Sequence, residues 1–549
     1  MQINLRFLAK KLISWQYDDY YGNTAPLKWW HWTIYKIFVV LIFIMAFFLD
    51  RHLPSVVPAS DYSRFSEARA RQFLKDFTSL GPRPVYSPNL QTVNGIISSS
   101  QNNKPAVLLN CHLDSVSAGP GATDDGAACA IYLDVLEVIT RRKLALQNDL
   151  IVIFNGGGNN LNGEKKLTVK AHEHLLLNID GKKTQPSTDS WILEAYAAHS
   201  QHPHFNIIAQ EIFQSGVVPS YTDFVVYSGQ ANLGGIDFAY YKNGWVYHTS
   251  EDIEDIIPKG SLQRAGDNIL AVVDALLKSP NMNSKSTYSG KHVFFDVVGL
   301  FAVSYRAFVA IILNVLSLIF VILLVALHLK FRKFNWKNLL FAIGHHLLVF
   351  VAMILLGLLI AGFLIAVGGT RTWNSSPFLV LIFYIYPTLG FGYFIHSIFV
   401  YRQQKLIENG EDDGYEGFAT KCRIRSSRCH VDFVFIKILK KDPKSWHIFV
   451  VQLVCQFCSL LMLCYMSVIL FSFSIPVLGR EARQSTAELA IMGTSVLVTY
   501  CVVLLTSNLL YITAPNPFIR FFAHLYCLLK QRLCKRELNR QQTTNEWKL

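Results

Sequence analysis

Residues 106–138, AVLLNCHLDSVSAGPGATDDGAACAIYLDVLEV, decide the fold of the hydrophilic part of this chain. The β-rich run 106–110 predicts a strand that places His112 at its end, and a turn rich in glycine and proline follows. Asp124 and Asp125 then open a stretch with apolar side chains at helical spacing, which predicts an amphipathic helix. A second apolar run, 149–154, predicts another strand. Strands alternating with helices are typical of an α/β domain with a mostly parallel, helix-covered sheet.

The composition indicates a membrane protein. The chain has 549 residues, of which 51% are hydrophobic and 16% are charged, whereas soluble proteins carry about 25% charged residues. The net charge of +13 can indicate a nucleic-acid partner, but the lysines and arginines gather in short loops between apolar runs, as membrane topology demands. Because no stretch reads as a groove-binding motif, we expect membrane lipids and no nucleic acid as partners.

Six apolar runs predict membrane spans. The first lies at 34–50 and has no small-residue cleavage site, so we interpret it as a signal anchor. The others lie at roughly 306–328, 339–367, 377–400, 446–474 and 487–513. Alternatively, one of these runs is a buried helix of a soluble domain. In that case the basic loops would no longer all fall on the same face of the membrane.

The basic residues predict the topology. If every run crosses, all basic segments fall on one face, so we expect both termini in the cytosol and the hydrophilic domain in a lumen or outside the cell. The predicted segments are a cytosolic stretch at 1–33, the signal anchor at 34–50, the hydrophilic domain at 51–290, a multi-span domain at 291–514 and a basic cytosolic tail at 515–549.

Two of the ten cysteines, Cys111 and Cys129, fall in the hydrophilic domain. They can pair with each other, but each is more simply explained as a small buried core residue.

Metal-binding residue types follow several of the strand-like runs. His112 and Asp124 lie on adjacent connections, where α/β folds place their ligands, and Asp180 and His248 follow later apolar runs. Two imidazoles and two carboxylates form a plausible zinc set. Asp114, two residues beyond His112, is well placed to orient the imidazole. Taken singly each residue is a weak indication, whereas the HxD pair followed by GATDDG is much more specific.

Several stretches together resemble the endoplasmic-reticulum metallopeptidase (Felix-ina-like) family, within the di-zinc aminopeptidases. They are CHLDSV, GPGATDDGAACA, IVIFNG, IAQEIFQSGVVPSYTDF and GIDFAYYKNGWVYHTSEDIEDII, and FFDVVGLFAVSY looks similar as well. The resemblance covers roughly residues 30–510. It implies a zinc-aminopeptidase-like sheet, a lumenal peptidase-like domain and an endoplasmic reticulum membrane address.

The resemblance also implies roles for individual residues. His112 and the bridging Asp124 match metal ligands, and Asp114 matches the aspartate that supports the imidazole. Asp180 matches the acidic ligand that completes the first zinc site, and His248 matches the imidazole ligand of the second zinc.

Two family glutamates, the general base and a ligand of the second zinc, are replaced by Gly158 and Asn159. Glycine has no side chain to accept a proton, and an amide oxygen is a neutral, weak ligand. The first zinc site then keeps all the protein ligands that the resemblance implies, while the second retains two good ligands. We therefore expect one zinc site at most. Glu164 is a less favoured substitute base, because its spacing requires a rebuilt loop.

Two functions remain open after these substitutions. The favoured one is a weak or inactive relative that binds lumenal protein partners, and the alternative is an active zinc metallopeptidase that hydrolyses peptides in the endoplasmic reticulum. The segment 84–106 is shorter than in the family, and fewer spans follow than the family usually has. A gene-model error or a spliced isoform would explain both.

Overall fold

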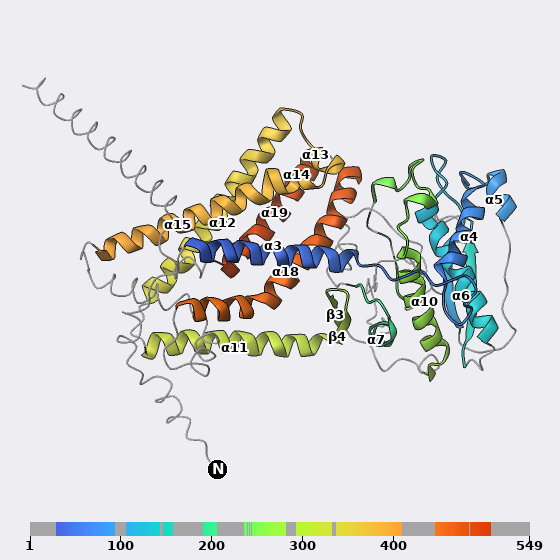
Figure 1. Cartoon of the computed structure of the whole chain (residues 1–549), viewed down its shortest axis with the longest axis horizontal. Coiled ribbons are helices and arrows are strands. Elements are labelled where there is room, and N and C mark those ends of the chain that lie inside the picture. Colours follow the sequence, from blue (N-terminus) through green and yellow to red (C-terminus); the bar gives the residue numbers. More distant parts are fainter. Residues whose placement is uncertain are drawn as a thin grey trace, which may run out of the picture. The chain divides into compact units, whose positions relative to one another are not determined.

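The computed structural model describes most of the chain (Figure 1). The described residues are 29–93, 106–142, 147–156, 190–205, 235–238, 240, 242, 244–280, 292–331, 336–408, 445–481 and 484–506. The chain forms two compact units. The hydrophilic unit contains residues 47–319 and 468–482, and the helical unit contains the remainder.

The hydrophilic unit is built from short strands and amphipathic helices. In chain order its elements are α4 (Glu67–Thr78), α5 (Pro88–Val93), β1 (Ala106–His112), η1 (Ala122–Gly126), α6 (Ala127–Arg142), β2 (Asp149–Asn155), α7 (Ser190–His199), η4 (Gly244–Val246), η5 (Glu254–Ile256), α10 (Ser261–Leu277), β3 (His292–Val297) and β4 (Phe301–Arg306).

Strands β1 and β2 form a parallel pair, in register from Ala106↔Asp149 to His112↔Asn155. All residues of β1 after Ala106 are buried. A parallel strand hidden on both faces needs helices on both sides. Helices α4, α6 and α10 supply apolar side chains to the same core as β1, as the fully buried Leu74, Leu109, Val135 and Val273 illustrate. The predicted α/β class is confirmed.

One buried carboxylate joins α4 to α10. Glu67 Oε2 accepts the backbone N–H groups of Gly260 and Gln263, both at 2.8 Å, and so satisfies donors that the first turn of α10 leaves open. The other oxygen accepts from Arg71 Nε at 2.7 Å.

A close contact also sets the packing of α10. A Cβ at Gly266 would overlap the ring of Phe65, so α10 requires glycine there.

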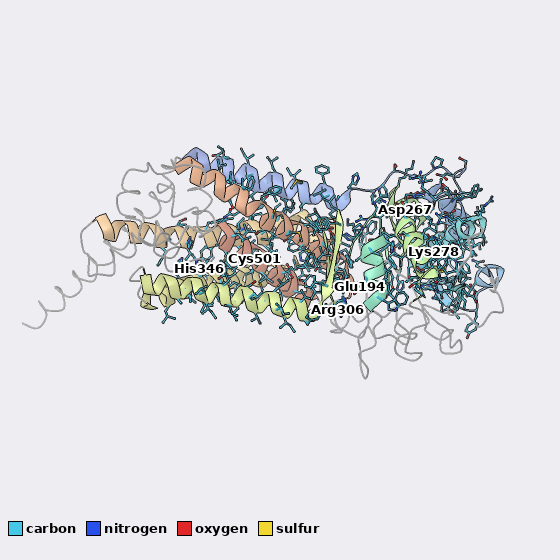
Figure 2. All side chains as sticks on the ribbon, turned by 90° about the horizontal axis from the view of Figure 1, so that it is seen from below. Glu194, Asp267, Lys278, Arg306, His346 and Cys501 are labelled. Carbon is cyan, nitrogen blue, oxygen red and sulfur yellow. A yellow bond between two sulfur atoms is a disulfide. The ribbon has the colours of Figure 1, made fainter. Side chains whose placement is uncertain are left out.

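Strands β3 and β4 form a separate antiparallel hairpin. It is followed without a break by α11 (Ala307–Phe331), in which apolar side chains project around the helix (Figure 2).

The remaining helices are long and apolar. They are α3 (Trp29–Arg51), α12 (Trp336–Ala366), α15 (Tyr386–Glu408), α18 (Ser445–Glu481) and α19 (Gln484–Thr506), with α13 (Thr372–Ser375), α14 (Phe378–Val380) and η7 (Leu381–Ile385) before α15. Among the described residues, five helices are long and apolar enough to cross a membrane: Thr33–Arg51, Ile343–Ala366, Phe378–Phe399, Gln456–Gly479 and Ser485–Thr506. The sixth predicted run falls on α11, whose searched apolar part, Ala307–Leu323, is shorter. The predicted multi-span helical region is confirmed, with five candidate spans among the described residues where the sequence predicts about six.

One buried carboxylate of the helical unit is held by three donors. The Glu488 carboxylate, fully buried at the start of α19, accepts from Trp373 Nε1 at 2.9 Å, from the Arg371 backbone N–H at 3.0 Å and from the Tyr384 hydroxyl. Because an unpaired carboxylate would be costly among apolar helices, these donors fix the 371–373 segment against α19.

Candidate metal centre

The carboxyl ends of β1 and β2 form one wall of the site. His112 is the last residue of β1, opposite Asn155, the last residue of β2. The strand predicted at 106–110 and the position of His112 at its end are confirmed. Asn155 leads into the glycine-rich segment, most of which lies outside the described residues.

The turn before α6 supplies the carboxylates. Asp124 and Asp125 lie in η1, with non-helical backbone angles and a cis peptide bond between them, and α6 begins two residues later at Ala127. Asp125 is buried, and its Oδ2 accepts the backbone N–H of His112 at 3.1 Å. Asp125 therefore ties this turn to the end of β1, which leaves Asp124 as the carboxylate that faces the site.

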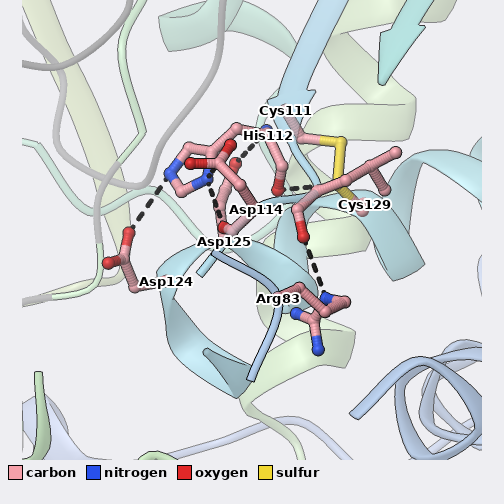
Figure 3. The surroundings of a disulfide bond; sticks show 8 residues. Arg83, Cys111, His112, Asp114, Asp124, Asp125 and Cys129 are labelled. Atoms are coloured by element: carbon pink, nitrogen blue, oxygen red, sulfur yellow. Dashed lines mark hydrogen bonds and ion pairs between the residues drawn. A yellow bond between two sulfur atoms is a disulfide. The ribbon is translucent and has the colours of Figure 1, made fainter. Parts of the chain in front are cut away.

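The Asp124 carboxylate lies between two imidazoles. Its Oδ1 is 3.3 Å from His112 Nε2 (Figure 3), and its Oδ2 is 3.0 Å from His248 Nε2. Burial would raise the pKa of Asp124, but the hydrogen bonds and charges of the two histidines outweigh it and hold the pKa below its ordinary value. The structure thus brings together three of the residues that the sequence singled out.

His248 reaches the site from a strained turn. Its φ is +62°, unusual for a residue with a side chain, and its ring stacks on that of Tyr247 with centroids 3.8 Å apart.

Asp114 supports the imidazole of His112 chiefly through its main chain. His112 Nδ1 lies 2.9 Å from the Asp114 carbonyl oxygen and 3.5 Å from the Asp114 carboxylate. A proton on Nδ1 would donate to that carbonyl and leave the Nε2 lone pair facing Asp124.

Two further residues lock the turn that carries His248 to the turn that carries Asp124. Asp252 Oδ1 accepts both the N–H and the hydroxyl of Thr123, at 2.8 and 2.7 Å, and the Asp252 carbonyl accepts the N–H of Ala122 at 3.0 Å. A Cβ at Gly119 would overlap the Thr249 carbonyl oxygen. Neither residue was predicted from the sequence to support the site, although Gly119 lies in the predicted turn and Asp252 lies in the SED stretch after His248.

Arg83 is buried behind the site. Its Nε donates to the Leu113 carbonyl at 2.9 Å, and its backbone N–H donates to Ser115 Oγ at 2.8 Å. Burial lowers the pKa of Arg83 to about 10, although the negative charges of Asp114 and Asp252 act in the opposite direction. Arg83 thereby fixes the backbone on both sides of Asp114.

The structure corrects the interpretation of the two cysteines. Cys111 and Cys129 form a disulfide, with Cα atoms 5.5 Å apart, between the end of β1 and the first turn of α6 (Figure 3). Both side chains are buried, so burial alone could not distinguish pairing from core packing. The ligand-type atoms of Cys111, Cys129 and Asp125 lie close together, but sulfurs joined in a disulfide are not thiolate ligands.

Three of the predicted site residues, Gly158, Asn159 and Asp180, lie outside the described residues. For the described part, two imidazole nitrogens and one shared carboxylate converge. Nitrogen and oxygen donors of this kind suit zinc, so this donor set fits the metal that the sequence predicts.

Comparisons with known proteins identify metallopeptidases among the proteins that this chain is similar to. Residues 92–273 match peptidase family M28. Over 400 residues the chain is 34% identical to putative endoplasmic reticulum metallopeptidase 1-A of Caenorhabditis elegans, covering 60% of this chain and 45% of that protein. Over 489 residues it is 30% identical to endoplasmic reticulum metallopeptidase 1 of Mus musculus, covering 81% of this chain and 53% of that protein.

The chain spans about half the length of these two relatives. Among solved structures, it is similar to BSAP, a zinc aminopeptidase from Bacillus subtilis. That match has a TM-score of 0.25 at 19% identity and covers 36% of this chain and 50% of the other.

Proposed function

The chain belongs to the M28 metallopeptidase family as a membrane-associated member, and from that membership we propose a zinc-binding relative of the aminopeptidases with weak or no peptidase activity. This function implies that the protein binds peptides or lumenal protein partners. The observation that carries the proposal is the position of the Asp124 carboxylate between His112 Nε2 and His248 Nε2.

His112, Asp124 and Asp180 would hold one zinc, and Asp124, His248 and Asn159 would form a second, weaker site. A bound zinc supplies Lewis acidity to a water or a peptide carbonyl. The protein's own part is to aim the two Nε2 lone pairs: the Asp114 carbonyl fixes the ring of His112, and the turn locked by Asp252 fixes His248.

The weak point is proton transfer. Gly158 occupies the position where the family carries its general base, and general-base catalysis is worth about 10²–10⁴ in rate. Asn159 replaces a carboxylate by a neutral amide, so the second site lacks one negative charge. A protein with this pair of substitutions would bind peptides or proteins at the site better than it cleaves them.

An active peptidase is the second candidate, and the paired histidines around Asp124 favour it. The supports of that arrangement, Asp252 on Thr123 and Arg83 on Leu113, are intact. A peptidase could retain them with another residue acting as base.

We further propose that the peptidase-like domain faces the lumen of the endoplasmic reticulum, with both termini in the cytosol. The disulfide between Cys111 and Cys129 supports this orientation, because such bonds persist in oxidising compartments. The basic segments predicted on the opposite face of the membrane agree with it.

The test uses the purified full chain in detergent. Bound zinc per chain and aminopeptidase turnover are measured for the wild type, for His112→Ala and for the double variant Gly158→Glu with Asn159→Glu. His199→Ala, which changes an exposed histidine at the end of α7, is the matched control.

About one zinc per chain, no turnover in the wild type and turnover gained by the double variant are the expected results. Two zincs with turnover that His112→Ala abolishes would support the active peptidase instead. Zinc content that His112→Ala leaves unchanged would refute the proposed site in both versions.

A further inference from the structure

The β3–β4 hairpin has two faces of different chemistry. In an antiparallel pair, residues directly opposite each other share a face. One face carries the pairs Val293↔Tyr305, Phe295↔Val303 and Val297↔Phe301, and the other carries His292↔Arg306, Phe294↔Ser304 and Asp296↔Ala302. The first set, here called the outer face, is entirely apolar or aromatic.

The opposite, inner face is fixed to the hydrophilic core. The buried ring of Phe294 stacks on Phe205 with centroids 5.3 Å apart. Asp296 exchanges two hydrogen bonds with the same residue: its N–H donates to the Phe205 carbonyl at 3.0 Å, and its Oδ1 accepts the Phe205 N–H at 3.2 Å. His292 Nε2 lies 3.1 Å from Glu194 Oε1 on α7. The outer face therefore points away from the core.

The outer face is incompletely covered. Along β3 the inner residues are buried, while Val293, Phe295 and Val297 are only half-buried. At the tip the side chains of Leu300 and Phe301 are 65% and 54% exposed. Contiguous exposed apolar surface of this kind marks a site of interaction with a membrane or another protein.

Continuity with α11 indicates which partner covers this face. Arg306 ends β4 and Ala307 begins α11, with no residue between them. The consecutive residues Ile311, Ile312 and Leu313 point in different directions around the helix, yet each is at least half exposed. A helix that is apolar on every side suits lipid rather than water.

The direction of the strands places the hairpin along the bilayer surface. In Figure 2 the hairpin runs across the end of α11 near Arg306 and does not extend the helix axis. If α11 crosses the membrane, the strands lie flat at its surface with the inner face toward the hydrophilic core. The outer face then meets the lipid.

We propose that the outer face of the β3–β4 hairpin rests in the interfacial layer of the bilayer, covered by phospholipid. Tyr305 suits this layer because it combines an apolar ring with a polar tip. Arg306 belongs to the inner face by its pairing, but it is exposed and ends β4 next to α11, where a cation suits the level of the lipid phosphates. The hairpin is thus a platform that holds the hydrophilic unit at a set height and tilt, whether or not the metal site is active.

The test is photocrosslinking of the full chain in phosphatidylcholine nanodiscs. The photoreactive residue p-benzoylphenylalanine replaces Phe295 or Phe301 on the outer face. Two controls carry it elsewhere: at Ser304, on the inner face of the same hairpin, and at Tyr86, which is 85% exposed and lies just before α5. Mass spectrometry of the irradiated protein counts the peptides that gain the mass of one phospholipid.

Several-fold more lipid adduct from Phe295 and Phe301 than from Ser304 and Tyr86 is the expected result. Adducts only to protein from the outer positions, or equal lipid labelling at all four, would overturn the proposal. If the label at the half-buried Phe295 prevents folding, Phe301 decides alone against Tyr86, because both side chains are already exposed.

Discussion

Asp124 Oδ2 and His248 Nε2 lie 3.0 Å apart, although their residues come from distant parts of the sequence. Asp124 also faces His112, so it is the one described carboxylate shared by both histidines. Removing it should therefore affect metal binding more than removing either histidine.

We expect Asp124→Ala to abolish zinc binding and His248→Ala to lower zinc affinity by at least about 10-fold, since even the loss of a residue that supports a ligand costs about 10–100-fold. Titration of the metal-free full chain with zinc and a competing chelator measures both. Asp274→Ala, a change on the outer side of α10, should leave the affinity unchanged. Equal losses in the Asp124 and His248 variants would contradict a shared ligand.

The contact between Gly119 and Thr249 predicts a conformational effect. Gly119→Ala would place a methyl group on the Thr249 carbonyl oxygen, and overpacking of this kind costs about 1–3 kcal/mol. The His248 turn should move away, with weaker zinc binding and faster hydrogen exchange across 244–252. Gly390→Ala is the control, because a Cβ there meets open space. Unchanged exchange in the Gly119 variant would mean that the turns adjust without strain.

Loss of the Cys111–Cys129 disulfide should destabilise the hydrophilic unit. A bond across 18 residues contributes about 3 kcal/mol by restricting the unfolded chain. Chemical unfolding of Cys111→Ala with Cys129→Ala should show a loss of this order, and Cys458→Ala, at an exposed free cysteine, should show none. If dithiothreitol destabilises the double variant as much as the wild type, the stabilising bond lies elsewhere.

Asp252→Ala should loosen the site without removing a ligand. The variant leaves the partly buried Thr123 N–H without its acceptor, and the cost of a fully buried unpaired donor, about 1–3 kcal/mol, is the upper limit of the loss. Unfolding in urea measures the loss, and Asp255→Ala, at an exposed position three residues on, is the matched control. A loss equal to that of the control would show that water replaces the Asp252 oxygen.

His204 predicts a dependence of stability on pH. Burial, and then the charges of Arg264 and Lys242, hold the pKa of His204 well below its ordinary value. Below about pH 6.5 the unfolded chain therefore takes up a proton that the folded chain does not, and stability falls as the pH falls. The loss is at most about 1.4 kcal/mol per pH unit, an upper limit because the side chain is partly exposed.

Hydrogen exchange of α7 at pH 7.5 and 5.5 (values chosen to lie about one unit on either side of the ordinary histidine pKa) measures this dependence. His204→Gln should reduce it, whereas the exposed His199→Gln should not. The same acid sensitivity in both variants would assign it to other groups.

The parts of the fold set by local sequence could be predicted. The apolar run at 106–110, the aspartates before α6 and the long apolar runs each depend on near neighbours in the chain, and each is found as the expected strand, turn or helix. The approach of His248 to Asp124 is different. It depends on how distant turns pack, so the residue pattern gave only a weak indication of it, and the family resemblance assigned His248 its role.

Local sequence patterns could not predict whether the two cysteines pair or which face of the hairpin meets the core. Cysteine is common in cores both free and bonded, so the sequence could not decide between the two for Cys111 and Cys129. The stretch FFDVVGLFAVSY alternates visibly, but which of its faces meets the core depends on contacts with Phe205, which lies 91 residues before Asp296.

The close approach of Gly119 to the Thr249 carbonyl oxygen also bears on how this protein can diverge over evolution. A mutation that adds a side chain at position 119 is acceptable only where the backbone at 249–250 has already shifted. The two positions should therefore covary among related sequences, and an insertion in one turn should be accompanied by a change of length in the other.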